Sequence, residues 1–215
     1  MDVKKEFTDF MMGAGVLTFG DFITKSGRKT PYFINAGKYC TGEQLATLGD
    51  FYARMIAESG ERFDILFGPA YKGIPLASVT AAALYKNHGI NIEYAFNRKE
   101  AKDHGEGGII VGATPKRGSR IAIIEDVTSA GTSIRETHEL MRNFEDISIT
   151  ALFVSVDRME RGTGELSALD ELRETFGIKV YPIITAREIV DALPEGDERV
   201  VRMNAYLAQY GAPGK

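Results

Sequence analysis

The sequence has few of the residues that build disulfides or metal clusters. Among its 215 residues are one cysteine, Cys40, three histidines and no tryptophan. A lone cysteine cannot close an intramolecular disulfide and supplies no thiolate cluster for a metal. No apolar run approaches the roughly 20 residues that a membrane-spanning helix needs, and the charged first ten residues do not resemble a secretory signal. These absences predict a cytoplasmic protein that does not enter a membrane.

The sequence also lacks an excess of positive charge. Lys and Arg number 26 against 30 Asp and Glu, for a net charge of −4, which argues against a non-specific nucleic-acid binder. The apolar fraction of 44% and the charged fraction of 26% are those of an ordinary globular chain. With no internal repeat and no Ser/Pro-rich linker, residues 1–215 are expected to form a single domain.

Short apolar runs alternate with amphipathic segments from residue 64 onward. The runs predict strands at 64–67, 92–96, 121–124, 149–156 and 180–184, with helices at 74–87, 134–144 and 166–176. Continuous apolar strands separated by helices indicate an α/β fold with a parallel sheet that is covered on both faces. In such sheets ligands bind at the carboxyl ends of the strands. Polar, glycine-containing residues follow these strands, so the site is expected there.

Three stretches lie outside this alternation. The first 40 residues predict a short helix at 4–12 and then β structure, and a further helix is expected at 41–56. Residues 98–116 are polar and punctuated by glycine, which predicts a long functional loop. The stretch from Pro194 onward has apolar positions at helical spacing and predicts a closing helix without an assigned function.

The most specific pattern runs from Ile121 to Ser133 and reads I-A-I-I-E-D-V-T-S-A-G-T-S. A buried strand would deliver Glu125 and Asp126 to its end, and a loop of small residues with Gly131 would then open a helix. Backbone N–H groups at a helix start bind phosphate, whereas carboxylates suit sugar hydroxyls or a hydrated divalent cation. The pattern therefore favours a ribose 5-phosphate site. The alternative is a strand-to-helix turn whose acids only cap the helix.

Two further patterns carry positive charge. The loop F-G-P-A-Y-K-G-I-P at 67–75 contains Lys72 among residues that expose backbone amides, and suits a diphosphate; the alternative is an ordinary turn. The string N-R-K-E-A-K-D-H-G at 97–105 concentrates cations and then runs into G-E-G-G. A charged run is often only a solvated face, but the adjoining glycines favour a mobile flap.

These patterns resemble the type I phosphoribosyltransferases, and the flap string together with P-A-Y-K-G-I-P resembles the orotate phosphoribosyltransferases among them. The resemblance implies a central, mainly parallel five-stranded sheet flanked by helices. It also implies a small N-terminal hood at about 1–40, a flexible flap at about 98–116, and often a cis peptide bond in the loop at 67–75. The implied reaction transfers 5-phosphoribosyl from 5-phosphoribosyl 1-diphosphate to orotate.

The resemblance also assigns roles to residues of this chain. Lys102 is expected to be catalytic together with Glu125 and Asp126. The residues expected to bind phosphoribosyl diphosphate are Lys25, Tyr71, Lys72, Arg98, Lys99, Lys102, His104, Glu125, Asp126, Val127, Thr128, Ser129, Ala130, Gly131, Thr132 and Ser133. Those expected to bind orotate are Lys25, Phe33, Ile34, Ser129 and Arg158.

The implied cofactor is Mg²⁺, held mainly through the substrate, with Glu125 and Asp126 as possible ligands. The implied assembly is a homodimer in which the flap of one subunit completes its partner's site, without nucleic acid or membrane. Two alternatives remain open. One is a phosphoribosyltransferase for another base, such as a purine or uracil. The other is a non-catalytic regulator that senses phosphoribosyl diphosphate, but such a protein is expected to lose the flap cations, which are present here.

Overall fold

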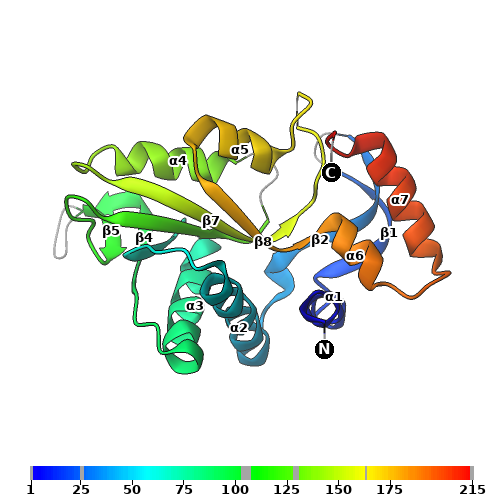
Figure 1. Cartoon of the computed structure of the whole chain (residues 1–215), viewed down its shortest axis with the longest axis horizontal. Coiled ribbons are helices and arrows are strands. Elements are labelled where there is room, and N and C mark those ends of the chain that lie inside the picture. The colour runs from blue at the N-terminus through cyan, green and yellow to red at the C-terminus, as the bar shows by residue number, and fades with distance from the viewer. Residues whose placement is uncertain (1, 25–26, 103–107, 128–130, 163, 214–215) are drawn as a thin grey trace.

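A computed structural model describes residues 2–24, 27–102, 108–127, 131–162 and 164–213, without the side chains of residues 101 and 102 (Figure 1). Its elements in chain order are α1 (Val3–Gly13), β1 (Leu17–Ile23), β2 (Lys29–Ile34), a 3-10 turn (Ala36–Lys38), α2 (Gly42–Ser59), β3 (Ile65–Gly68), α3 (Gly73–His88), β4 (Glu93–Lys102), β5 (Gly108–Gly112), β6 (Arg120–Glu125), α4 (Thr132–Met141), β7 (Ser148–Asp157), α5 (Ala168–Phe176), β8 (Lys179–Thr185), α6 (Ala186–Ala192) and α7 (Glu198–Tyr210).

The main sheet has six strands in the order β5-β4-β3-β6-β7-β8. The five strands from β4 to β8 in this order run parallel, and only β5 is antiparallel. Residues 121–124 of β6 and 151–154 of β7 are all fully buried, as expected of parallel strands covered on both faces. The predicted mainly parallel sheet is therefore confirmed, with one antiparallel edge strand added.

Helices cover both faces of this sheet. In Figure 1, α2 and α3 lie on one face and α4 and α5 on the other. Alternate residues of β6 point to the two layers: Ile124 joins the apolar cluster that includes α2 and α3, whereas Ile123 packs with α4 and α5. Helix α2 begins at a capping box between Thr41 and Gln44, which satisfies backbone N–H groups at its start.

A second unit forms from both ends of the chain. Strands β1 and β2 pair antiparallel with Thr18 opposite Phe33, separate from the main sheet. Helix α7 packs beside this hairpin, with the Tyr206 ring 6.0 Å from the Tyr32 ring in an edge-on arrangement. Figure 1 shows α1, α6, α7 and the hairpin gathered at one end of the sheet. The predicted closing helix is thus present as α7.

The stretch 98–116, expected to be a loop, is partly strand. Strand β4 continues to Lys102, and β5 returns beside it with Asn97 opposite Ile110 and Lys102 opposite Gly108. The physical reason is the β-branched run at 109–111, which favours a strand despite the flanking glycines. Residues 103–107, the centre of the predicted flap, lie outside the described residues. Within the described part of the chain, no helix combines the length and the apolar character needed to cross a bilayer.

Candidate functional site

The end of β6 places Glu125 and Asp126 at the carboxyl edge of the sheet, where each is only 8% exposed. The backbone of both acids is held by hydrogen bonds. The Tyr52 hydroxyl donates to the Glu125 carbonyl oxygen at 2.7 Å. The Asp126 carbonyl oxygen accepts from the Ser155 hydroxyl at 2.6 Å and from the Ser155 backbone N–H at 2.8 Å. The backbone at the two acids is therefore held by α2 and β7.

The two carboxylates differ in their surroundings. Burial raises the pKa of Glu125 from its usual value of 4.5 to about 7; a hydrogen bond with the Ser133 side chain opposes this rise, and the negative charge of Asp126 adds to it. The Asp126 backbone N–H also donates to Glu125 Oε1 at 3.1 Å. Glu125 can therefore exchange a proton near neutral pH.

A helix start lies beside the acids. Gly131 caps α4 with φ +64°, and Thr132 and Ser133 form the first turn. A Cβ at Gly131 would lie 2.8 Å from Leu172 Cδ2, so the position requires glycine both for its backbone conformation and for space. The first N–H groups of a helix have no intrahelical acceptor and attract an anion. Val127 precedes this turn, and the predicted phosphate ligands Thr128, Ser129 and Ala130 lie outside the described residues.

The loop between β3 and α3 approaches the acids from the neighbouring strand. Lys72 Nζ lies 2.8 Å from Asp126 Oδ2, although the Lys72 side chain is 60% exposed. The Ala70–Tyr71 peptide bond is cis, as the resemblance implied, and the Tyr71 side chain is exposed. A Cβ at Gly68 would lie 2.0 Å from the Gly73 carbonyl oxygen. The two ends of the loop therefore touch, so residues 69–72 form a tight turn beside the acids.

Asn97 ties this loop to β4. Its Oδ1 accepts the Ala70 backbone N–H at 2.9 Å, and its Nδ2 donates to the Arg98 carbonyl oxygen at 3.3 Å. Asn97 stands in the cationic string, but no role was predicted for it. The only signal in the sequence was its place just before Arg98, after the apolar run at 92–96.

The predicted flap cations lie only partly among the described side chains. Arg98 Nη1 donates to the Gly108 carbonyl oxygen at 3.1 Å, and Lys99 Nζ lies 3.3 Å from Glu136 Oε2 on α4. Both cations line a cavity of about 200 Å³ together with Ala70 and Ser133, so the loop before α3, the start of α4 and the middle of β4 meet there. The Lys102 side chain and His104 lie outside the described part.

The predicted nucleobase residues lie between the hairpin and the end of β7. Phe33 is 43% exposed and stacks on Phe22 with ring centroids 5.5 Å apart, and Ile34 ends β2 beside it. Arg158 follows β7 with its guanidinium 4.4 Å from the centre of the Tyr32 ring. The hairpin thus offers an exposed aromatic ring and the end of β7 offers a cation, while Lys25 and Ser129 lie outside the described residues.

Some contacts of the site had no counterpart in the sequence analysis. No role was predicted for Tyr52, Ser155 or Glu160. A larger cavity of about 930 Å³ lies between β1, β2 and α7, and none of the predicted site residues that the structure describes lines it.

Comparison with known proteins gives one consistent result. Residues 37–168 match the family profile described as the phosphoribosyl transferase domain. The chain is 51% identical over 219 residues to the orotate phosphoribosyltransferase of Clostridium beijerinckii, covering 97% of this chain and 98% of the relative. It is 46% identical over 211 residues to that of Escherichia coli O157:H7, covering 97% and 98%.

A solved structure agrees with these relatives. The crystal structure of the orotate phosphoribosyltransferase of Francisella tularensis superposes with a TM-score of 0.87 at 37% identity, covering 96% of this chain and 99% of that one. Since almost no part of these chains is left unmatched, the chain belongs to the orotate phosphoribosyltransferases, a family of phosphoribosyl transferases.

Proposed function

We infer that the protein transfers the 5-phosphoribosyl group from 5-phosphoribosyl 1-diphosphate to orotate, giving orotidine 5′-monophosphate and diphosphate. One observation carries this function: the buried acid pair at the end of β6 adjoins the glycine-capped start of α4, in a chain that is 51% identical to an orotate phosphoribosyltransferase along nearly its whole length. The acid pair beside the start of α4 suits a ribose 5-phosphate, and the similarity to an orotate phosphoribosyltransferase supports orotate as the base.

The protein residues would act by position and charge rather than as a covalent nucleophile. Displacement at the anomeric carbon develops positive charge on the ribose ring, which the carboxylates of Glu125 and Asp126 would stabilise while they accept the ribose hydroxyls. The N–H groups at residues 131–133, with the loop 127–130, would hold the 5′-phosphate. Two anchors on one sugar fix the reacting carbon between them, which lowers the entropic cost of the encounter.

The leaving diphosphate needs cations. Lys72, with the exposed Tyr71 beside it, is the described cation closest to the acids, and its contact with Asp126 keeps it in place before the substrate arrives. Arg98, Lys99, Lys102 and His104 would add charge from the flap, and Lys102 is our candidate for the residue that matters most in the transition state. A general acid in this position contributes typically 10²–10⁴-fold. Lys25 would reach the same region from the hood.

Orotate would occupy the space between the hairpin and β7. Phe33 and Ile34 offer apolar contact to the flat ring, Arg158 offers a cation to its carboxylate, and Lys25 and Ser129 complete the predicted set. A planar guanidinium pairs with a carboxylate through two parallel hydrogen bonds. This pairing would distinguish orotate from bases that lack the carboxylate.

The residues present fit Mg²⁺. Among the described residues no group of three or more acidic, histidine or cysteine side chains could hold a metal, and the two carboxylates at the end of β6 suit an ion that keeps most of its ligands as water and substrate oxygens. Glu125 and Asp126 are therefore the candidate protein ligands. When bound, Mg²⁺ would supply charge neutralisation and a template for the diphosphate and ribose hydroxyls.

The remaining expectations belong to the same proposal. The chain would act as one catalytic domain in a cytoplasmic homodimer, with a hood formed by residues up to about 40 and a flap around residues 98–116 that completes the partner's site. The short antiparallel pairing of Lys102 with Gly108 supports a flap that projects beyond the sheet edge. Sedimentation analysis tests the dimer. Mixed dimers of two inactive variants, one changed in the flap and the other in the site that the flap completes, test the shared site.

The direct test is incubation with orotate, phosphoribosyl diphosphate and Mg²⁺ while the absorbance of orotate is followed. We expect orotate to be consumed only when all three are present. If uracil or a purine reacts instead, the base assignment is wrong; if no base reacts but phosphoribosyl diphosphate binds, the protein is a regulator.

Asp126→Asn tests the sugar site. Replacing a charged hydrogen-bond partner should lower kcat/KM for phosphoribosyl diphosphate by roughly 10–100-fold. Asp146→Asn is the matched control, because Asp146 is exposed and lies in a turn between α4 and β7. Wild-type kinetics in Asp126→Asn would refute the assignment of ribose to this acid.

A further inference from the structure

The guanidinium of Arg158 is held on two sides. One face lies 4.4 Å from the centre of the Tyr32 ring, a cation–π contact. Its Nη2 donates to Glu160 Oε1 at 2.6 Å, and the side chains of Arg158 and Glu160 are only 15% and 14% exposed. No other polar partner of this guanidinium is found among the described residues. Donors on Nε and Nη1 therefore remain for a ligand.

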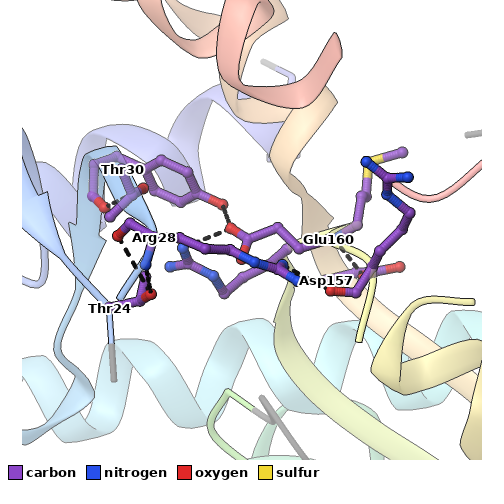
Figure 2. Close-up of polar contacts among 9 residues, drawn as sticks. Thr24, Arg28, Thr30, Asp157 and Glu160 are labelled. Carbon is purple, nitrogen blue, oxygen red and sulfur yellow. Dashed lines mark hydrogen bonds and ion pairs between the residues drawn. The ribbon is translucent and has the colours of Figure 1, made fainter. Parts of the chain in front are cut away.

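Glu160 connects the two contacts of Arg158. Its Oε1 also accepts the Tyr32 hydroxyl at 3.0 Å, so one carboxylate oxygen bridges the cation and the ring that the cation covers. Figure 2 shows the Glu160 side chain extending toward Arg28 and Thr30 of the hairpin region. Since Tyr32 is fully buried and Thr30 donates to its carbonyl oxygen at 3.1 Å, the ring itself has little freedom to move.

The segment that carries Glu160 is fixed by the C-terminal part of the chain. The Arg161 N–H donates to the Tyr210 carbonyl oxygen at 2.9 Å, and the Ala212 N–H donates to the Met159 carbonyl oxygen at 2.8 Å, which forms an antiparallel bridge between Glu160 and Gly211.

The hairpin side holds the same segment. Arg28 donates to the carbonyl oxygens of Arg161 at 2.8 Å and Gly162 at 3.1 Å. On the other side of Glu160, the Met159 N–H donates to Asp157 Oδ1 at 2.8 Å. Glu160 thus stands on a backbone that is anchored from three directions.

We propose that Glu160 is a positioning residue for base recognition: it holds the Arg158 guanidinium against Tyr32 so that the remaining donors face the carboxylate of the incoming base. This role presupposes the proposed function, in which Arg158 binds orotate. A free arginine side chain has many rotamers, and fixing it in advance removes an ordering cost that each binding event would otherwise carry. Because Tyr32 covers one face and Glu160 occupies Nη2, a carboxylate can approach only in the plane of the remaining N–H groups.

Glu160→Gln is the test, because it keeps the shape of the side chain and removes its charge. We expect the KM for orotate to rise roughly 10-fold, the difference between a charged and a neutral hydrogen bond. The KM for phosphoribosyl diphosphate and kcat should stay within about 2-fold, because binding that is equal in the ground and transition states changes KM alone. Glu165→Gln is the matched control: it lies in the same connection, is 79% exposed, and should leave all three constants unchanged.

A double-mutant cycle distinguishes positioning from general loosening of the fold. In an Arg158→Gln background, Glu160→Gln should cause no further rise in the KM for orotate. The carboxamide of orotate, which lacks the carboxylate, should inhibit wild type and Glu160→Gln equally. Thermal melting of each variant checks that the fold persists. An unchanged orotate KM in Glu160→Gln, or additive losses in the double variant, overturns the positioning role while the proposed function stands. If wild type does not consume orotate, the proposed function fails and this role fails with it.

Discussion

Replacing Glu125 with glutamine should stabilise the protein while it impairs the reaction. Glu125 is 8% exposed, and burial raises its carboxyl pKa to about 7. At pH 8 the wild-type side chain is charged in a site that disfavours charge. Glutamine is neutral at every pH and has nearly the same shape, and its oxygen can still accept the Asp126 N–H that Glu125 Oε1 accepts.

The magnitude follows from the pKa. A shift from 4.5 to about 7 makes the charged carboxylate about 3 kcal/mol less stable in the folded protein than in the unfolded chain. The folded state binds this proton more tightly than the unfolded chain does. The free energy of unfolding of the wild type therefore falls by about 3 kcal/mol as the pH rises from the unfolded pKa of 4.5 to above the folded pKa of about 7. The advantage of Glu125→Gln should therefore be about 3 kcal/mol at pH 8 and less than about 1 kcal/mol at pH 5.

Thermal unfolding at the two pH values is the measurement. For a chain of this length, about 3 kcal/mol corresponds to a rise in Tm of roughly 6–12 °C at pH 8. Glu145→Gln, at an exposed glutamate, is the control and should change the free energy of unfolding by less than about 0.5 kcal/mol at either pH. A stabilisation equal at pH 5 and pH 8, or a destabilisation at pH 8, would show that burial of the charge is not the cause.

The other predictions concern the machinery around the acids. Lys102→Ala should lower kcat by at least about 10²-fold while the Kd of phosphoribosyl diphosphate changes little; steady-state kinetics with a normal kcat would remove Lys102 from its central role. Gly68→Ala should lower the free energy of unfolding by more than about 3 kcal/mol, because its Cβ would lie 2.0 Å from the Gly73 carbonyl oxygen; denaturant unfolding measures this. Tyr52→Phe should cost about 1 kcal/mol of stability and raise the KM for phosphoribosyl diphosphate more than that for orotate, because the lost hydroxyl holds the Glu125 backbone.

The central sheet could be predicted because its signals are local. Each parallel strand is a short apolar run, and each is followed by turn residues that show where the chain leaves the sheet. The same signals predicted a site at the carboxyl ends of the strands, and the structure places Lys72 after β3 within 2.8 Å of Asp126 after β6. The chemical roles of these residues remain predictions.

Strand β5 and the supports of the site could not be predicted, because their signals are weak or distant. The β-branched run at 109–111 is short and lies between glycines, so its composition resembles a loop. Tyr52 meets the Glu125 carbonyl oxygen 73 positions away. Glu160 is fixed by Gly211, and neither position belongs to a periodic pattern. Such contacts depend on how whole elements pack, which a single sequence does not reveal residue by residue.

The pairing of residues 159–161 with residues 210–212 has a consequence for biosynthesis. On the ribosome, strands β3 and β6, which carry the loops proposed to bind the sugar phosphate, emerge first and can begin to pack. The backbone beneath Glu160 gains its last partner only when Ala212 has left the exit tunnel. On the proposed assignments, a nascent chain would form its ribose 5-phosphate site before the support of Arg158 is complete, and discrimination among bases would mature last.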